Sequence, residues 1–488
     1  MTGPATAGYE AVIGLEVHAQ LLTESKMFCG CSARYAGAPP NSHVCPVCLG
    51  LPGSLPVINE KAFDSAIKVA AAMNCDVAPV TRFDRKNYPY PDIPKGYQIS
   101  QYDMPIGRDG HIEIHVAGGR QRVGIIRVHL EEDTGKSIHA NVGGREVSLV
   151  DYNRAGVPLL EIVSEADLRS SEAARQYFST LREVLVYLGV SSGDMQEGAL
   201  RADVNVSVRK PGDDFGVKVE IKNLNSFRSV GSAVDFEIKR HVEILEAGGN
   251  LSQETRGWDD AAQVTIGQRS KEFAEDYRYF PEPDLPPLNI SPAFLDAIRS
   301  SMPETANSKR ARFMDEYGLS EYDATVVTQD PDMARLLDQT VGLPTKPSPK
   351  IVANWLTGEF LRLLNETGIP MDQTRITPAG LGGLVDLLGD GTITTAIGKT
   401  VFEEMFRTGD SPASIVDARG LRQVSDHAEL EAAVKTVISE NPALVSDYVE
   451  KDRKTEGPLV GKVMAATGGK ANAAVVKQII ARFLLGSR

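Results

Sequence analysis

Hydrophobic and polar residues alternate one by one in four stretches of the N-terminal part of the chain: 12–21, 126–131, 200–209 and 217–222. Successive side chains of a β-strand point to opposite faces, so each stretch predicts a strand with one apolar face and one polar face. In the second stretch the pattern places Ile126 on the apolar face, together with Val128 and Leu130. The last two stretches flank the turn-rich residues 211–214 and therefore predict a hairpin.

Helical periodicity appears between Tyr177 and Leu188, where apolar residues recur at spacings of three and four. Ser170 or Ser171 provides an N-cap for this helix, and Gly189 ends it. We expect the helix to pack on the sheet.

A proline-rich stretch at residues 281–287 excludes a helix interior or a central strand, and it marks a domain boundary near residue 293. Beyond this boundary the apolar spacing is helical. The sequence therefore predicts an α+β protein. A region with an antiparallel sheet spans 1–293, an all-α helical domain spans 294–408, and a small helical domain spans 409–488.

The polar faces of the predicted strands combine carboxylates, histidines, amides and cations. Their members are Glu16, His18, Gln20, Arg127, His129, Glu131, Arg201, Asp203, Asn205, Ser207, Arg209, Lys218, Glu220 and Lys222. A half-buried antiparallel sheet normally turns such a face toward solvent. The same residues also suit a cradle in which carboxylates bind a hard cation and basic side chains bind phosphates. The pattern alone leaves both interpretations open.

Two further stretches, residues 85–101 and 151–161, are rich in tyrosines, cations and turn residues. Loops of this composition often carry binding sites, although their tyrosines would equally suit packing on the sheet. The three prolines of the first stretch argue against regular structure there.

Four cysteines form two close pairs, Cys29 with Cys31 and Cys45 with Cys48. Such pairs in an intracellular chain predict tetrahedral thiolate coordination of zinc within an insertion at 29–48. Four thiolates leave no open position for substrate, so this zinc would be structural. Free thiols and a redox pair are the alternatives. Cys75 stands alone and is expected in the core.

Composition and charge describe an ordinary globular protein of 488 residues with a net charge of −13. Five cysteines in a long chain do not suggest a disulfide framework, and neither a secretory signal nor a membrane span is evident. We therefore expect a cytoplasmic protein. Residues 451–488 carry eight basic and two acidic residues, which suits either phosphate binding or a solvated helix surface.

Two motifs resemble catalytic signatures without their context. Residues 132–137 end like a phosphate-binding loop, but Leu130 stands where that pattern requires glycine. Residues 189–193 match G-x-S-x-G, yet they follow a predicted helix, whereas a nucleophile elbow joins a strand to a helix. We therefore predict no hydrolytic nucleophile in this chain.

Seven motifs follow one another along the chain, at residues 12–18, 83–88, 97–101, 130–133, 161–165, 220–226 and 276–284. In sequence and in order they resemble motifs of the GatB family, the tRNA-handling kinase and transamidase component of the heterotrimeric tRNA-dependent amidotransferase. The resemblance implies a cradle domain that acts as kinase and transamidase, then a helical domain and a tRNA-binding tail. It also implies that the cysteine quartet, which only some members have, is structural.

The activity implied by this resemblance is the ATP-dependent conversion of Glu-tRNA(Gln), Asp-tRNA(Asn) or both to the amidated forms. ATP phosphorylates the side-chain carboxylate, because oxide is a poor leaving group, and ammonia then displaces phosphate. A separate amidase (glutaminase) subunit would supply ammonia from glutamine, and a small third subunit would brace the pair. ATP, Mg²⁺ and structural Zn²⁺ are the expected cofactors.

The resemblance also assigns site residues. It implies Mg²⁺ ligation by Glu16, His18, Glu131 and Glu161, of which Glu16, His18 and Glu131 are the catalytic candidates. Strand geometry adds Arg201, Asp203, Asn205 and Lys222 as contacts for nucleotide and substrate. Lys86, with residues 88–90, is a candidate for lining an ammonia channel.

Two other functions fit part of the pattern. An ATP-dependent ligase for a free carboxylic acid would share the cradle without needing a basic tail. A non-catalytic, zinc-containing RNA-binding scaffold would keep the cysteines and the tail without needing carboxylates aligned on a sheet.

Overall fold

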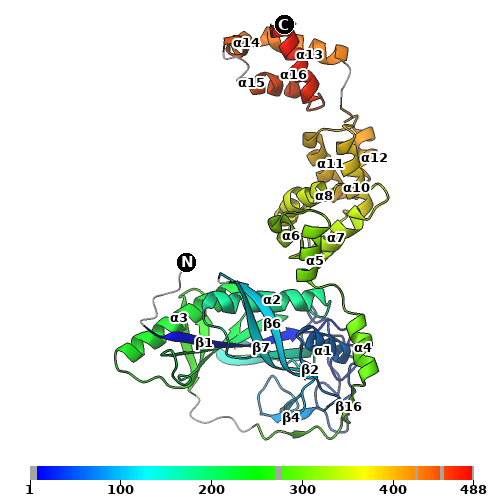
Figure 1. Cartoon of the computed structure of the whole chain (residues 1–488). Coiled ribbons are helices and arrows are strands. Elements are labelled where there is room, and N and C mark those ends of the chain that lie inside the picture. The colour runs from blue at the N-terminus through cyan, green and yellow to red at the C-terminus, as the bar shows by residue number, and fades with distance from the viewer. Residues whose placement is uncertain (1–7, 118, 271–276, 424–426, 451–455, 486–488) are drawn as a thin grey trace. The chain divides into compact units, whose positions relative to one another are not determined.

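The structure, a computed structural model, describes residues 8–117, 119–270, 277–423, 427–450 and 456–485 (Figure 1). Two compact units make up the chain, Met1–Thr305 and Ala306–Arg488. The first is built around a sheet and the second is helical, which confirms the predicted α+β class. Asp276 of the last family-like motif lies outside the described residues, and so do Lys451, Arg453, Lys454 and Arg488 of the basic tail.

A nine-stranded sheet forms the centre of the first unit, and all its neighbouring strands are antiparallel except β12 and β13. Its strands, from one edge to the other, are β14 (Val264–Ser270), β13 (Glu254–Asp259), β12 (Val219–Leu224), β11 (Leu200–Arg209), β1 (Glu10–Gln20), β10 (Pro158–Ser164), β7 (Gly119–Glu132), β6 (Gly107–Val116) and β2 (Asp76–Val77). The predicted hairpin is confirmed, since β11 pairs antiparallel with β12.

Three helices cover the apolar face of this sheet: α1 (Glu60–Ala72), α2 (Ser171–Tyr187) and α3 (Phe227–Glu246). Ser170 caps α2 by accepting a hydrogen bond from the backbone of Ala173, so the predicted helix and its cap are confirmed. Ile13 and Val17 of β1 are fully buried beneath these helices. The same strand therefore turns Glu16 and His18 to the opposite, polar face.

Smaller strands complete the first unit. They are β3 (Val80–Thr81), β4 (Asp84–Asn87), β5 (Tyr97–Ser100), β8 (Lys136–Val142), β9 (Arg145–Asp151), β15 (Phe280–Pro281) and β16 (Leu288–Asn289). The proline-rich stretch 85–101 was expected to lack regular structure, and this expectation was wrong at its ends. Both ends pair as β4 and β5, because the three prolines all fall in the connection between them.

Ile126 departs from the predicted alternation. Its side chain is 40% exposed, whereas the neighbouring Ile125 is buried. The register between β7 and β10 shifts at Val163 and Ser164, so that Arg127 and Ile125 face consecutive residues of β10. A β-bulge of this kind reverses the side on which the following residues lie. The prediction that Ile126 faces the core was therefore wrong.

The helices beyond the sheet begin with α4 (Pro292–Ser300), whose Ile298 packs into the core of the first unit. That unit includes α4 and extends to Thr305. The second unit comprises α5 (Ala306–Asp315), α6 (Glu321–Val327), α7 (Pro331–Val341), α8 (Pro349–Trp355), η1 (Leu356–Phe360), α9 (Leu361–Thr367), η2 (Met371–Gln373), α10 (Pro378–Gly389), α11 (Thr395–Thr408), α12 (Pro412–Ala418), α13 (His427–Glu440), α14 (Pro442–Glu450), α15 (Glu456–Ala466) and α16 (Ala473–Leu485).

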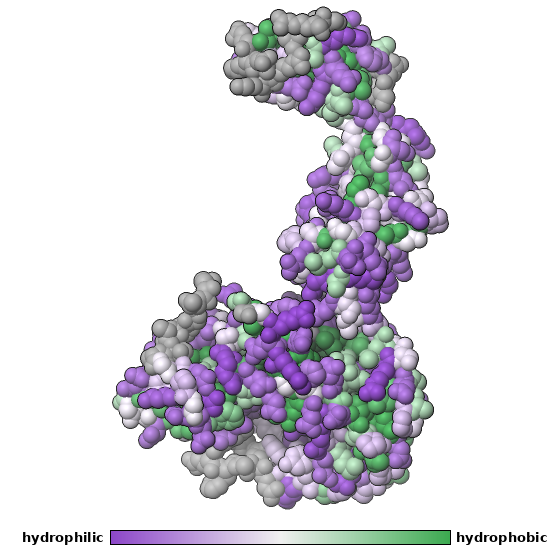
Figure 2. All heavy atoms as spheres, in the orientation of Figure 1, coloured by the Kyte–Doolittle hydropathy of each residue, from purple (hydrophilic) through white to green (hydrophobic). Residues whose placement is uncertain are grey.

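Two separate hydrophobic clusters stabilise the second unit. The first runs from Phe313 to Val416 and includes α12, and the second runs from Leu430 to Ile480. On the face shown in Figure 2, polar residues cover much of these helices, as expected where apolar residues are gathered inside. No helix of the described residues is both long and apolar enough to cross a membrane.

A buried ion network attaches α3 to the edge of the sheet. The Glu237 carboxylate accepts hydrogen bonds from Arg240 at 2.8 Å and from Thr265 of β14, and it lies 3.2 Å from the Arg256 guanidinium of β13. Burial opposes ionisation of Glu237, but hydrogen bonds from His241 and Arg240 lower its pKa to about 2. The charged form of this carboxylate therefore stabilises the fold.

Glu237→Gln is expected to lower the free energy of unfolding at neutral pH by roughly 3 kcal/mol, because it removes the buried carboxylate that Arg240 and Arg256 share and leaves both paired with Glu254 alone among the described residues. The folded pKa lies below the ordinary value of 4.5, so this contribution is complete above pH 4.5 and is lost as the pH falls toward 2. Chemical denaturation of the two proteins across this range measures the difference. Glu243→Gln, an exposed position on the same helix, is the control. An unchanged stability of Glu237→Gln at neutral pH would contradict the network's role.

Candidate active site on the polar face of the sheet

A row of four polar side chains crosses four adjacent strands. His18 of β1 lies opposite Glu161 of β10 on one side and opposite Arg201 of β11 on the other. Glu161 in turn lies opposite His129 of β7. Because neighbouring strands are about 4.8 Å apart, the register alone brings residues from four distant parts of the sequence together.

A cluster of three side chains forms where this row crosses β1, β10 and β7. It consists of His18, Glu161 and Glu131, which lies two residues after His129 on β7. The His18 Nε2 atom is 3.5 Å from the Glu161 carboxylate and 3.9 Å from the Glu131 carboxylate. One ligand atom from each residue lies within 4.8 Å of the others, and all three side chains are largely buried. Three of the four residues expected to hold Mg²⁺ are therefore neighbours.

Glu16, the fourth of these expected ligands, lies two residues before His18 on the same face of β1. It is not part of the group formed by His18, Glu131 and Glu161. Its carboxylate accepts a hydrogen bond of 3.2 Å from the Asn205 side chain. Burial and the nearby Glu161 raise the pKa of Glu16. Its position suits a contact beside the cluster more than direct membership in it.

His129 was placed on the polar face by the alternation but was not chosen as a site residue. Its Nε2 atom is 3.5 Å from Glu161 and 3.8 Å from Glu131, and the side chain is 4% exposed. The pattern therefore contained the signal, but only the register shows that this histidine reaches both carboxylates.

The electrostatics of the cluster favour ionised carboxylates. Burial opposes the charged forms, yet interactions with His129 and His18 lower the pKa of Glu161, and a hydrogen bond from His129 lowers that of Glu131. Burial likewise opposes protonation of His18, but Glu161 raises its pKa. Two buried carboxylates beside an imidazole form a donor set that suits a divalent cation such as Mg²⁺ or Mn²⁺.

The candidates for phosphate and substrate contacts lie on β11 and β12. Lys222 pairs with Asp203 at 2.8 Å and with Glu220 at 2.5 Å, so its charge is balanced within the sheet. Arg201 makes one ion pair, of 3.3 Å, with the buried Asp133. It lies beside His18 in the register, whereas Arg127 of β7 contacts the cluster itself, 3.4 Å from the Glu161 carboxylate.

Lys86 lies on β4, outside the main sheet. Its ammonium group is 5.0 Å from the centre of the Tyr277 ring and 5.8 Å from that of Tyr88. The adjacent strand β5 reaches the cluster, because the Ser100 hydroxyl donates a hydrogen bond of 3.2 Å to Glu131. The β4–β5 ribbon therefore borders the candidate site.

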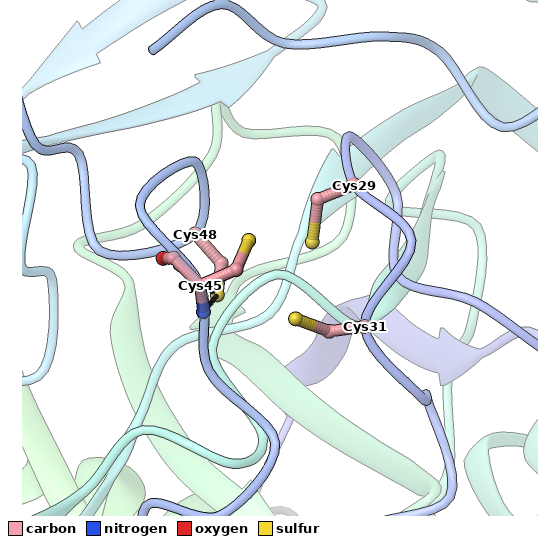
Figure 3. A group of neighbouring side chains, drawn as sticks. All are labelled: Cys29, Cys31, Cys45 and Cys48. Carbon is pink, nitrogen blue, oxygen red and sulfur yellow. Dashed lines mark hydrogen bonds between the residues drawn. The ribbon is translucent and has the colours of Figure 1, made fainter.

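The four cysteines form a second group. The sulfur atoms of Cys29, Cys31, Cys45 and Cys48 come from two loops and point toward one another (Figure 3). They lie within 4.8 Å of one another, and none forms a disulfide. Four thiolates around zinc, with Zn–S bonds of about 2.3 Å, lie about 3.8 Å apart, so the group fits that ion.

Lys26 is buried beside the cysteine group. Its ammonium donates to the carbonyl oxygens of His43 at 2.7 Å and Tyr152 at 3.2 Å, and it lies 3.8 Å from the Cys48 sulfur. The hydrogen bond between Cys29 and Cys48 lowers the pKa of the Cys48 thiol to about 5 and raises the pKa of the Cys29 thiol. A buried cation beside crowded thiols suits an assembly of thiolates.

Neither look-alike motif has the context of a catalytic loop. Residues 132–137 connect β7 to β8 rather than to a helix, and residues 189–193 follow α2. The elements that flank the two motifs therefore differ from those of a phosphate-binding loop and of a nucleophile elbow.

Fold and site together define a protein with a sheet cradle that collects carboxylates, histidines and arginine on one face. Comparison with known families extends this description. Residues 11–296 match the model of the GatB/GatE catalytic domain, and residues 336–484 match that of the GatB domain.

Curated relatives cover nearly the whole chain. The B subunits of the aspartyl/glutamyl-tRNA(Asn/Gln) amidotransferases of Thermoanaerobacter sp. and Caldanaerobacter subterraneus are 52% and 53% identical over 97% of this chain and 98% of their own length. That of Brevibacillus brevis is 49% identical over 98% of this chain and 99% of its own length. The chain belongs to the GatB family of amidotransferase B subunits. The predicted family is confirmed.

Proposed function

We propose that this chain catalyses the ATP-dependent amidation of the side-chain carboxylate of Glu-tRNA(Gln), Asp-tRNA(Asn) or both. The family membership over nearly the whole chain supports this function, because the curated relatives are named for it. It also favours this function over a small-molecule ligase or an RNA-binding scaffold. The convergence of His18, Glu131 and Glu161 on the polar face is the observation that carries the chemistry.

The reaction needs two steps. A carboxylate oxygen of the substrate attacks the γ-phosphorus of ATP, and ADP leaves with the electrons of the broken bond. Ammonia then attacks the carbonyl carbon of the resulting acyl phosphate, the carbon–oxygen bond to phosphate breaks, and inorganic phosphate leaves with the proton that the nitrogen loses, which gives the amide. The first step brings two anions together and the second releases an anion, so the site must offset negative charge.

His18, Glu131 and Glu161 are the residues that would hold a divalent cation, with Glu16 beside them. Such a cation supplies charge neutralisation during phosphoryl transfer. Arg201, adjacent in the register, would bind a phosphate or carboxylate oxygen, since a guanidinium donates in a fixed fork geometry. Asn205, Asp203 and Lys222 border this region and would orient bound substrate. His129 would hold the two carboxylates in place.

The proposed partners follow from membership in a family of amidotransferase components. An amidase (glutaminase) subunit would release ammonia from glutamine, a small third subunit would stabilise the pair, and Lys86 would line the path by which ammonia arrives. The tail domain, with Lys462, Lys470 and Lys477, would contribute to binding tRNA. We propose a cytoplasmic location, where aminoacyl-tRNA is made, and a structural zinc held by the cysteine quartet.

The activity itself is tested by assembling the chain with its partner subunits and supplying ATP, Mg²⁺, glutamine and either glutamyl-tRNA(Gln) or aspartyl-tRNA(Asn). The amino acid recovered from the tRNA is the readout. Glutamine or asparagine is expected only when ATP is present. An assembled complex that hydrolyses glutamine but amidates neither tRNA would reject the proposal.

Glu131→Gln is expected to weaken Mn²⁺ binding by about tenfold or more, because a neutral amide replaces an anionic ligand. Transamidation should fall by at least about 100-fold, since charge neutralisation in phosphoryl transfer is worth several kcal/mol. Binding of tRNA should be retained. Calorimetric titration with Mn²⁺ and the transamidation assay measure both effects. Glu113→Gln, at an exposed position on β6, is the matched control, and equal Mn²⁺ affinity in both variants would exclude Glu131 as a ligand.

Cys45→Ser is expected to remove zinc from the purified protein and to lower its thermal unfolding temperature, because three thiolates hold the ion less tightly than four. Wild-type protein should contain about one zinc per chain. Cys75→Ser is the control, since Cys75 is buried elsewhere in the core and should not affect zinc content. Elemental analysis distinguishes these cases. Wild-type protein purified with no bound metal would contradict the zinc site.

A further inference from the structure

A chain of hydrogen bonds connects residues 29–48, here called the cysteine segment, to the polar face of the sheet. The Tyr35 hydroxyl, between the two cysteine pairs in the sequence, donates to the Gln20 side-chain oxygen at 3.1 Å. The Gln20 amide nitrogen donates to the Asp133 carboxylate at 2.7 Å. The other oxygen of Asp133 accepts a bond of 3.3 Å from Arg201. Three side chains therefore lead from Tyr35 to the arginine beside His18.

The direction of these bonds is determined by chemistry. The Asp133 carboxylate can only accept, so the amide nitrogen of Gln20 must face it. This orientation leaves the amide oxygen of Gln20 toward Tyr35, which therefore has to donate. Burial raises the pKa of Tyr35, which keeps the proton on its hydroxyl. Without that donor, Gln20 loses the contact that holds its carbonyl group away from Asp133.

Asp133 is held firmly by its backbone. Its N–H donates to the carbonyl of Val157 at 2.8 Å, and its own carbonyl accepts from Gly156 at 2.9 Å. Its side chain is buried, and Gln20 makes its shortest contact with a side chain. Gln20 donates to one carboxylate oxygen at 2.7 Å, with the Arg154 guanidinium 3.8 Å away, and the Thr134 N–H donates to the other oxygen at 2.9 Å. Arg201 contacts this second oxygen. Loss of the Gln20 bond therefore removes the shortest side-chain contact of the carboxylate and loosens the group that Arg201 contacts.

The cysteine segment is itself fixed to the loop that precedes β10. The backbone N–H of Asn41 donates to the Asp151 carboxylate at 2.9 Å, and that of His43 donates to the Asn153 side chain at 2.8 Å. Tyr35 therefore projects from a segment anchored on both sides, by the cysteine group and by this loop. The position of the Tyr35 hydroxyl relative to the polar face is therefore restrained from both sides of the segment.

From this geometry we propose that Tyr35 and Gln20 are positioning residues for Arg201, so that the cysteine segment helps to orient the arginine that binds substrate. The proposal rests on the proposed function, which assigns Arg201 to an anionic substrate. It gives the cysteine segment a role in catalysis beyond stabilising the fold. Neither Tyr35 nor Gln20 needs to touch the reacting atoms.

The alternative is that Tyr35 only stabilises its own loop. The effect of a substitution on KM, compared with its effect on stability, distinguishes the two roles. A loosened Arg201 weakens binding of the substrate that it contacts, which raises KM for that substrate. Loss of a purely structural bond lowers the amount of folded protein or its thermal stability and changes no KM selectively. Tyr35→Phe removes one hydroxyl and keeps the ring that lines a neighbouring cavity of about 670 Å³.

The experiment uses the assembled complex. KM and kcat for ATP and for the aminoacyl-tRNA are first measured with Arg201→Ala, to identify the substrate that this arginine contacts. Tyr35→Phe is expected to raise KM for the same substrate by roughly threefold to tenfold, the effect of losing one hydrogen bond, with little change in kcat. Gln20→Met, which removes both bonds of the amide, should raise it further. Tyr322→Phe, at an exposed position of α6, is the control.

The double variant Arg201→Ala with Tyr35→Phe tests whether Tyr35 acts through Arg201. Once Arg201 is alanine, Tyr35→Phe should have no additional effect on KM, because the group that it positions is gone. Zinc content, Mn²⁺ affinity and thermal unfolding of Tyr35→Phe should match those of the wild type.

Three results would overturn the proposal. One is an unchanged KM in Tyr35→Phe while Arg201→Ala raises the KM. This result would reject the positioning of Arg201 by Tyr35 and Gln20 and would leave the proposed function intact. Another is full additivity in the double variant. A third is an Arg201→Ala complex with unaltered kinetics. This result would contradict both the binding role of Arg201 and its positioning by Tyr35 and Gln20. Absence of transamidation in the wild-type complex would instead reject the proposed function itself.

Discussion

The register of β1 between β10 and β11 is the constraint on which the site depends. A one-residue slip of this strand would exchange its two faces, turning His18 toward the helices and Ile13 toward the polar side. Burial of Ile13 and its apolar neighbours beneath α2 and α3 therefore selects the register that places His18 between Glu161 and Arg201. The hydrophobic core positions the polar cluster, although the two share no side chain.

This arrangement collects charges that would be costly in isolation. Glu131 and Glu161 are largely buried close to one another, and nearby cationic groups oppose the effect of burial on their pKa values. His129 acts on both carboxylates, His18 and Arg127 act on Glu161, and Lys86 acts on Glu131. A site with excess buried negative charge is suited to a cation, and a cation is what phosphoryl transfer between anions requires. The stabilising partners and the proposed chemistry therefore follow from the same electrostatic condition.

The two candidate metal groups differ in how they are assembled. The cysteine group comes from two loops within residues 29–48, so its spacing in the sequence nearly defines it. The group of His18, Glu131 and Glu161 draws on three strands, and no local spacing predicts it. The hydrogen bonds from Tyr35 through Gln20 connect the segment that carries the first group to Asp133, beside the second group.

The sequence by itself determined the alternation of the predicted strands other than at Ile126, the α2 helix with its cap, and the cysteine quartet, because these depend on periods of two to four residues and on local bonds. Its family-specific motifs also identified the family. Only the tertiary structure decided which polar residues meet. It set Glu16 apart from the cluster and brought His129 into it, and the bulge at β7 turned Ile126 outward. Register and bulges arise from pairing between distant strands, and a single chain's pattern does not encode these contacts locally.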